Sequence, residues 1–155
     1  MASKRKHWTA AWAKFGPCEH FLAAAKKTKS ITEFWRTCER GDWMLWMAGK
    51  TCGDDRRQLV LAACKCARLA LPYVKAGETR PLAAIETAER WARREKGVSI
   101  DDVQRAADAA YAAANSAANS AAYAAANAAN AAYAATFKQC ANIVREFFPK
   151  PPRVK

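Results

Sequence analysis

Tyr and Asn side chains recur at helical spacing within a tract that is otherwise almost entirely alanine. The tract runs from Ala106 to Ala135, and the residues that interrupt the alanines include Tyr111, Asn115, Asn119, Tyr123, Asn127, Asn130 and Tyr133. Phenol rings offer faces for stacking, and each amide offers both hydrogen-bond donors and acceptors. This mixture suits a nucleobase, a nucleotide or a polar helix of a partner, and it equally suits packing between neighbouring helices.

Charged side chains near this stripe are candidates for reading a ligand. Asp108 is the one acid within the stripe, where it could contact a ligand or neutralise a buried arginine. Arg80 and Arg90 precede the tract and are candidates for holding a phosphate, because guanidinium groups bind phosphate through paired hydrogen bonds. The alternative is a structural role, in which Arg80 reaches Glu86 or Asp108 and Arg90 pairs with Glu86 or Glu95 on a solvated face.

A second candidate cluster lies in the string Gly41-Asp42-Trp43-Met44-Leu45-Trp46. Trp43 and Trp46 are three residues apart and therefore share one face of a helix. That face is either core or a platform for a ligand or partner. Asp42 is a typical helix N-cap residue, and we expect it to cap the helix that carries the two tryptophans.

The alanine tract predicts one long helix, because alanine is the residue that most favours helix. At about 100° per residue the polar and aromatic side chains share one half of this helix. The opposite half carries only methyl groups, which would let another helix approach closely.

The rest of the chain also predicts helices, each with recognisable start and stop residues. The first expected helix runs from the capping box at Ser30-Ile31-Thr32-Glu33 through Arg40 and is ended by Gly41, and the second runs from Asp42 to Gly49. The third carries Leu59 to Leu71 and stops near Pro72, and the fourth begins at Thr79-Arg80-Pro81 and is ended by Gly97. The alanine helix is opened by Ser99-Ile100-Asp101-Asp102, and Phe147-Phe148-Pro149 ends the fold. No strand is needed, so we predict an all-α, single-domain helical bundle that is monomeric or forms a small oligomer.

Length and charge limit the organisation and the partners. The 155 residues suit one domain, which we divide into a basic flexible N-terminus (1–7), a helical domain (8–148) and a basic, proline-containing tail (149–155). The formal net charge of +12 favours an anionic partner. Part of this charge sits in the two ends, where it could serve solubility alone.

Cysteine usage and hydropathy favour a cytoplasmic protein. Nothing resembling a secretory segment or a membrane span is present, so we expect the six cysteines to be reduced thiols. Only two histidines exist, and neither completes a zinc-binding spacing, so we expect no metal and no cofactor.

Four parts of the chain together resemble a known family. They are the Gly41-to-Trp46 string, the Ala-, Cys- and Arg-rich run from Leu59 to Leu71, the string Arg80-Pro81-Leu82-Ala83-Ala84-Ile85-Glu86-Thr87-Ala88, and the alanine tract with spaced tyrosines. In this order, over roughly Cys38 to Ala135, they are similar to the putative immunity protein family of bacterial and phage genomes. The resemblance implies an all-helical fold and protection against polymorphic toxins by binding.

Three binding functions remain open from the sequence, and catalysis is disfavoured. No phosphate-binding loop, nucleophile elbow or metalloprotease motif occurs, so we expect no enzymatic activity. The chain would bind a protein effector or toxin, sequester an anionic nucleotide signal as an anti-defence protein of a phage would, or, with less support, bind nucleic acid. The candidate binding residues are Asp42, Trp43, Trp46, Arg80, Arg90, Asp108, Tyr111, Asn115, Asn119 and Tyr123.

Overall fold

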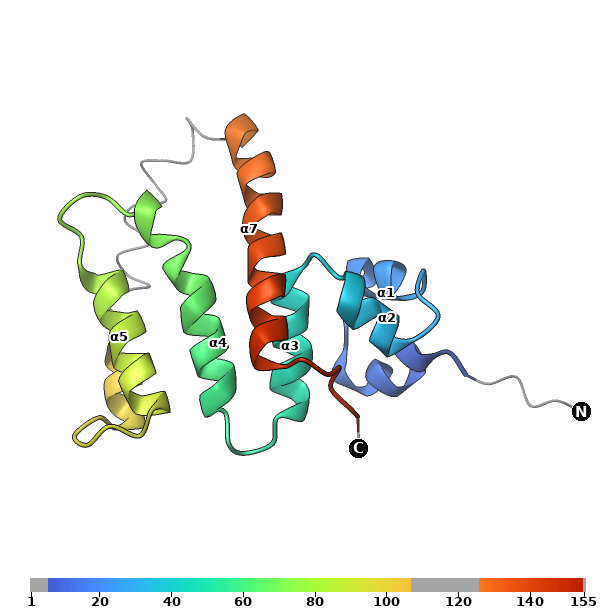
Figure 1. Cartoon of the computed structure of the whole chain (residues 1–155), viewed down its shortest axis with the longest axis horizontal. Coiled ribbons are helices and arrows are strands. Elements are labelled where there is room, and N and C mark those ends of the chain that lie inside the picture. The colour runs from blue at the N-terminus through green and yellow to red at the C-terminus, as the bar shows by residue number, and fades with distance from the viewer. Residues whose placement is uncertain (1–5, 107–125, 155) are drawn as a thin grey trace, which may run out of the picture.

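The computed structural model describes residues 6–106 and 126–154, and for Tyr73 and residues 126–135 the backbone only (Figure 1). Every regular element in this part of the chain is helical, which confirms the all-α prediction. The elements are η1 (Trp8–Phe15), α1 (Glu19–Ala25), α2 (Ile31–Thr37), α3 (Gly41–Thr51), α4 (Arg57–Arg68), η2 (Leu71–Tyr73), α5 (Arg80–Ala92) and α7 (Ala126–Phe147), and residues 100–106 are also helical.

Two central helices separate the molecule into two ends. α3 packs against α7, and α4 packs against α5, α7 and α3. Figure 1 shows η1, α1 and α2 on one side of the α3–α7 pair and α4 and α5 on the other. We call η1, α1 and α2, residues 8–37, the N-terminal helices.

Large side chains from both sides form one core. The largest side chains with almost no exposed surface are Trp12, Phe21, Met44, Met47 and Val144. They come from η1, α1, α3 and α7, so the core joins the N-terminal helices to the central pair. Burying each such side chain contributes about 1.5–3 kcal/mol, which makes this cluster the main reason that the short N-terminal helices are held in place.

Gly41 allows α3 and α7 to touch through their backbones. A Cβ at this position would lie 2.7 Å from the backbone nitrogen of Ala141 and from the carbonyl carbon of Cys140. The expectation that Gly41 ends the preceding helix is therefore wrong. α2 ends at Thr37, where Cys38 is extended, and Gly41 is the first residue of α3 because only a residue without a side chain fits there.

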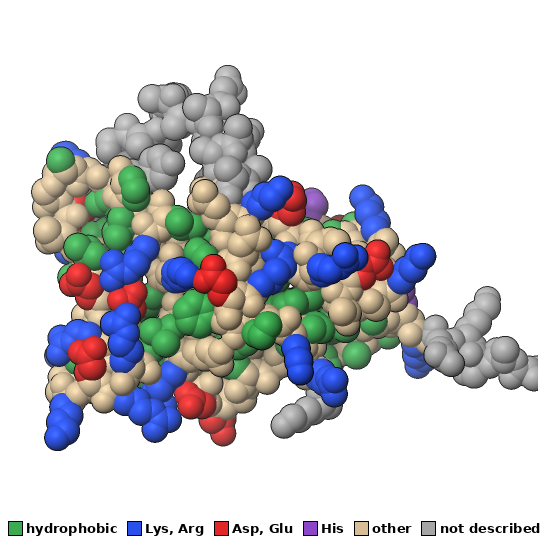
Figure 2. Space-filling view, in the orientation of Figure 1, with side chains coloured by type: hydrophobic (Ala, Val, Ile, Leu, Met, Phe, Trp, Pro, Cys, Tyr) green, Lys and Arg blue, Asp and Glu red, His purple; other side chains and the backbone are tan. Residues whose placement is uncertain are grey.

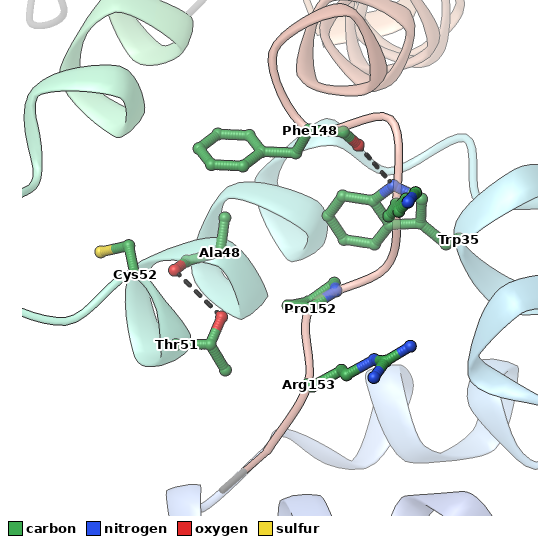
Figure 3. Close-up of a pocket in the computed structure, with 8 residues that line it drawn as sticks. Trp35, Ala48, Thr51, Cys52, Phe148, Pro152 and Arg153 are labelled. Carbon is green, nitrogen blue, oxygen red and sulfur yellow. Dashed lines mark hydrogen bonds between the residues drawn. The ribbon is translucent and has the colours of Figure 1, made fainter.

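The C-terminal tail lies against the N-terminal helices and α3 (Figure 3). The indole N–H of Trp35 donates to the carbonyl of Phe148 at 2.9 Å, and Nε of Arg145 donates to the carbonyl of Trp35 at 2.9 Å. Pro152, Arg153 and other tail residues line a small pocket of about 200 Å³ against Trp35 and α3, and Val154 packs on the core. The tail thus contributes packing as well as charge.

Local capping predictions agree well with the structure. The Ser30 hydroxyl accepts the Glu33 N–H at 3.1 Å. Ser99 and Asp102 cap each other reciprocally, with Ser99 N donating to Asp102 at 2.8 Å.

Several helix ends fall elsewhere than predicted. α3 continues past Gly49 to Thr51, and α4 ends at Arg68, well before Pro72. α5 ends at Ala92 and not at Gly97, because Arg94 takes the left-handed position (φ 60°) after the helix.

The alanine tract is described only in part. Residues 126–135 are helical and continue into α7, which ends at Phe147 as predicted. Residues 107–125 lie outside the described part of the chain, so the single long helix stays a prediction. Across the described ranges, no helix combines the length and apolarity that crossing a membrane requires.

Candidate functional site

An open cleft of about 410 Å³ lies between the N-terminal helices and the start of α3. It is lined by Gly16, Pro17, Cys18, Phe21, Arg40, Asp42, Trp43 and Trp46. The turn from η1 into α1 forms one wall, where Gly16 adopts the left-handed conformation (φ 62°) that a glycine takes readily. The first turn of α3 forms the other wall. We call this site the aromatic cleft.

Arg40 contacts two aromatic rings and one carboxylate at the aromatic cleft. Its guanidinium carbon lies 4.5 Å from the ring centroids of Trp43 and of Phe137, a residue of α7. Its Nε and Nη2 donate to the two carboxylate oxygens of Asp42 at 2.9 and 2.7 Å. Hydrogen bonding to Asp42 raises the pKa of Arg40 above its ordinary value, so the side chain remains charged at every physiological pH.

This arrangement leaves Arg40 available to a partner. The fork to Asp42 uses two of the five N–H donors of a guanidinium group. The side chains of Arg40 and Asp42 are 42% and 40% exposed. The pair therefore presents donors and acceptors at the surface in a fixed orientation.

The floor of the cleft is aromatic. The ring of Phe21 meets Trp43 edge-on, with centroids 5.8 Å apart, and meets Trp46 at 5.3 Å. Trp46 also contacts the buried ring of Trp12 at 5.8 Å. Trp43 and Trp46 are half-buried, so each ring packs on the core and also lines the cleft. Both rings therefore belong to the core and are also accessible from the cleft, and the binding platform stays a prediction.

Three predicted site residues meet here, one of them in a different role. Asp42, Trp43 and Trp46 all line the aromatic cleft. The prediction that Asp42 caps the helix is wrong, because α3 begins one residue earlier, at Gly41, and the carboxylate of Asp42 is bound by Arg40. Its position in the first turn still favours the helix, since a negative charge there complements the helix dipole.

Sequence reasoning missed Arg40, Cys18 and Phe137. Arg40 lies two residues before Asp42, which is a signal that could have suggested the fork. Phe137 lies on a distant helix, and nothing local places it on Arg40. Cys18 is an exposed thiol on the rim.

The predicted arginines of α5 lie away from the cleft and pair locally. Arg80 forms a two-pronged ion pair with Glu78, with Nε donating to Oε1 at 2.8 Å, and not with Glu86, while Asp108, the other expected partner, lies outside the described residues. This contact lowers the pKa of Glu78 to about 2. Arg90 pairs with Glu95 at 3.1 Å, which is one of the surface pairs predicted for it. Neither residue contributes to the aromatic cleft.

The remaining candidates cannot be placed. Asp108, Tyr111, Asn115, Asn119 and Tyr123 lie outside the described residues. The proposed ligand stripe on the alanine helix therefore stays a prediction.

A buried carboxylate ties α4 to α5. Glu89 is 8% exposed and receives both Nε (2.8 Å) and Nη2 (2.9 Å) of Arg68, while Arg93 lies 3.4 Å away. These hydrogen bonds, above all from Arg68, lower the pKa of Glu89. Both neighbours, Arg68 and Arg93, are cations, so the burial of the Glu89 carboxylate is explained by its role in joining α4 to α5.

The thiols differ sharply in exposure. Cys18 is exposed, Cys52 is half-buried, and Cys38, Cys64, Cys66 and Cys140 are buried without disulfides. Burial raises the pKa of Cys64 to about 11 and that of Cys66, which also contacts the thiol of Cys140, to about 12. Among the described side chains, no group of three or more His, Cys, Asp and Glu is arranged to hold a metal ion.

Comparison with known proteins identifies the family. A family model described as Imm-5 like putative immunity protein matches residues 50–139, which include α4 and α5 and extend into α7. No curated protein and no solved structure matches the chain. The family description indicates an immunity-type role and, in general terms, a protein effector or toxin as the bound partner. Because the match covers more than half of the residues and agrees with the resemblance seen in the sequence, the chain belongs to the Imm-5 like putative immunity protein family.

Proposed function

We propose that this chain protects a bacterial cell by binding a protein effector in a stoichiometric complex, without catalysis, and that the aromatic cleft is part of the contact surface. The observation that carries the proposal is the combination of Arg40, Trp43 and Trp46 around an open cleft. Family membership supplies the immunity-type role.

The residue types of the cleft support an interface. Trp and Arg dominate the binding energy of protein interfaces, especially where they line pockets that a partner side chain can fill. Trp43 and Trp46 are half-buried and still reach the cleft. Arg40 is fixed by two rings and by Asp42, so little side-chain entropy would be lost when a partner binds.

The chemistry of the lining supports binding over catalysis. A general acid or base needs a titratable group that is free to exchange a proton with a substrate. The carboxylate that lines the cleft, Asp42, is engaged by Arg40 at two oxygens. The thiol of Cys18 is exposed on the rim, and no described histidine lines the cleft beside it. We therefore assign the cleft to recognition.

The buried thiols support a reducing location. Four buried cysteines without disulfides suit the bacterial cytoplasm, where thiols remain reduced. We propose that the effector is met there.

A titrated protection assay tests the proposal. Bacteria that produce one toxin domain from a panel are given increasing amounts of this chain, and survival is plotted against the ratio of the two proteins. Stoichiometric binding predicts full protection at about one equivalent and a complex that elutes as one species in size exclusion. Protection at a small fraction of an equivalent would indicate an enzyme and would refute the proposal.

Matched variants locate the surface. Arg40→Gln and Trp43→Ala should abolish protection, with helical circular dichroism unchanged. Arg36→Gln changes the same charge on the neighbouring helix α2, where the side chain is exposed, and should protect normally. If Arg40→Gln protects as well as Arg36→Gln, the cleft is not the contact. If the protected cells instead yield an intact nucleotide from the purified chain, the sequestration of a signal replaces the protein effector.

A further inference from the structure

Lys and Arg side chains form ion pairs more often at one end of the molecule than at the other. Within residues 50–139, most described Lys and Arg side chains lie in ion pairs, namely Arg57, Lys65, Arg68, Arg80, Arg90, Arg93, Arg94, Arg105 and Lys138. At the other end, no described carboxylate is within ion-pair distance of Lys6, Lys26, Lys27 or Lys29. These four lysines are all exposed. Figure 2 shows Lys and Arg interspersed with Asp and Glu over the α4 and α5 end, and acidic side chains also lie among the cations toward the N-terminal helices.

Three of these lysines sit on a rigid turn between α1 and α2. The backbone N–H groups of Lys27 and Thr28 donate to the carbonyls of Ala24 and Ala25 at 3.2 and 3.1 Å. The Thr28 hydroxyl donates to Ala25 O at 2.8 Å, and Lys29 N donates to the Glu33 carboxylate at 2.7 Å. The turn therefore presents its charges in a fixed arrangement.

His7 brings a fourth lysine to the same turn. Its Nε2–H donates to the carbonyl of Thr28 at 2.8 Å, while its Nδ1 accepts the backbone N–H of Thr9 at 3.4 Å. The indole N–H of Trp8 reaches the same Thr28 carbonyl at 3.4 Å. Lys6 directly precedes His7, so it is anchored beside Lys26, Lys27 and Lys29. We call these four lysines the basic turn.

The basic turn and the aromatic cleft lie at opposite ends of α1. Cys18, on the rim of the cleft, precedes α1, and Lys26 follows it. At about 1.5 Å per residue the two points are roughly 12 Å apart along the helix. A standard interface buries about 800 Å² on each partner, a patch about 30 Å across, and would cover both.

We propose that the basic turn binds an acidic face of the effector while the aromatic cleft receives that effector's apolar side chains. This inference rests on the proposed function and adds the chemistry of the partner. The ammonium groups of these lysines form no ion pair with a described carboxylate, so the turn carries a net positive charge even with Glu33 beside it, and this charge attracts an acidic surface and speeds its association. An effector with a cationic face, as a nuclease needs for its own substrate, would be repelled.

The surroundings of the turn favour an acidic protein over single-stranded nucleic acid. Single strands are bound by exposed aromatic rings that stack on the bases. The rings beside the basic turn are packed on one another: Trp8 and Phe34 have centroids 5.4 Å apart, and Phe34 is buried. The indole N–H of Trp8 is directed at the turn itself.

Two triple variants of the full chain test the inference. One carries Lys26→Glu, Lys27→Glu and Lys29→Glu. The control carries Lys50→Glu, Lys75→Glu and Lys96→Glu, three exposed lysines outside the N-terminal helices, one at the end of α3 and two at the α4 and α5 end. Each change removes two units of charge, so both triples lower the net charge of +12 by the same amount.

The probes are a short poly-L-glutamate peptide and a DNA duplex at equal charge concentration, with binding followed by NMR amide shifts at two salt concentrations. We expect poly-L-glutamate to perturb residues 26–29 first, and the turn variant to lose at least about tenfold in affinity while the control loses less than about threefold. If both triple variants lose affinity for poly-L-glutamate equally, net charge alone explains the binding and the inference is overturned. Tighter binding of the duplex through the same residues would overturn it in favour of nucleic acid.

The protection assay separates this inference from the proposed function. If wild type and the turn variant both protect at one equivalent with equal association rates, the function stands and the basic turn is refuted. If wild type protects against no toxin while poly-L-glutamate still binds at residues 26–29, the acidic-ligand site stands and the immunity mechanism fails.

Discussion

Gly41→Ala is a direct test of how closely α3 and α7 approach. The added methyl group would lie 2.7 Å from Ala141 N and from the carbonyl carbon of Cys140, whereas unstrained contacts of this kind require about 3.5 Å. The Cβ of Cys140 lies closer still, and none of these three atoms can move without shifting the backbone of α7. Overpacking of this kind costs about 1–3 kcal/mol, and the reduced entropy of the unfolded chain offsets about 0.4–1 kcal/mol.

The expected net loss is about 1.3 kcal/mol, which for a chain of this size lowers Tm by roughly 3–5 °C. Gly49→Ala is the matched control on the same helix, because a Cβ there meets only the end of the Leu59 side chain at 3.3 Å. A flexible side chain can yield, and Ala favours the helix interior by up to about 1 kcal/mol, so this variant should be at least as stable as wild type.

Thermal and urea unfolding followed by circular dichroism at 222 nm measure both variants. Gly41 also separates Arg40 from Asp42, so a shifted α3 should change the tryptophan emission of the aromatic cleft. If Gly41→Ala and Gly49→Ala unfold at the same temperature, the two helices are not in backbone contact and the packing argument is wrong.

Three further outcomes follow from single contacts. Arg94→Gly should raise Tm by about 2–4 °C in a thermal melt. A left-handed residue other than glycine costs about 1–2 kcal/mol, and the greater entropy of the unfolded glycine chain cancels only part of the stability gained by removing that cost. A lower Tm in the variant would contradict this reasoning. The pKa of Glu89 is lowered by Arg68, so its ion pair stabilises the fold above pH 4.5, the ordinary pKa, and is lost as pH falls through the folded pKa. Glu89→Gln should therefore lower Tm at pH 7 and differ less from wild type below pH 4.5, whereas a constant difference would refute the assignment. A maleimide should label Cys18 first in the native chain and Cys66, buried and with a pKa of about 12, only after unfolding, as mass spectrometry of the labelled peptides will show.

The parts of the fold that depend on neighbouring residues were predictable. The capping contacts of Ser30 and of Ser99 with Asp102 follow from side chains three residues apart, and α5 begins at Arg80, with Pro81 in its first turn, as expected. Gly41 was misassigned because glycine both ends helices and permits close packing. Only the distant contact with Cys140 decides between these roles.

The candidate site was predictable in part for the same reason. Helical periodicity placed Trp43 and Trp46 on one face, which the cleft confirms. The stacking of Arg40 on Phe137 joins residues far apart in the chain, and no local pattern reports it. The expected pairing of Arg80 with Glu86 was also wrong, because a glutamate two residues before it in the preceding loop is reached more easily than one on the helix.

The contact between Trp35 and Phe148 has a consequence for synthesis on the ribosome. These residues are 113 positions apart, and Arg145 binds the same N-terminal segment. A nascent chain grows at about 5–20 residues per second, so η1, α1 and α2 wait several seconds or more for the residues that complete their packing. Throughout that delay the tryptophans of the N-terminal segment lack their final cover, and exposed apolar surface of this kind favours aggregation. The aromatic cleft is completed only when Phe137 of α7 reaches Arg40, although the residues that line the cleft are translated first.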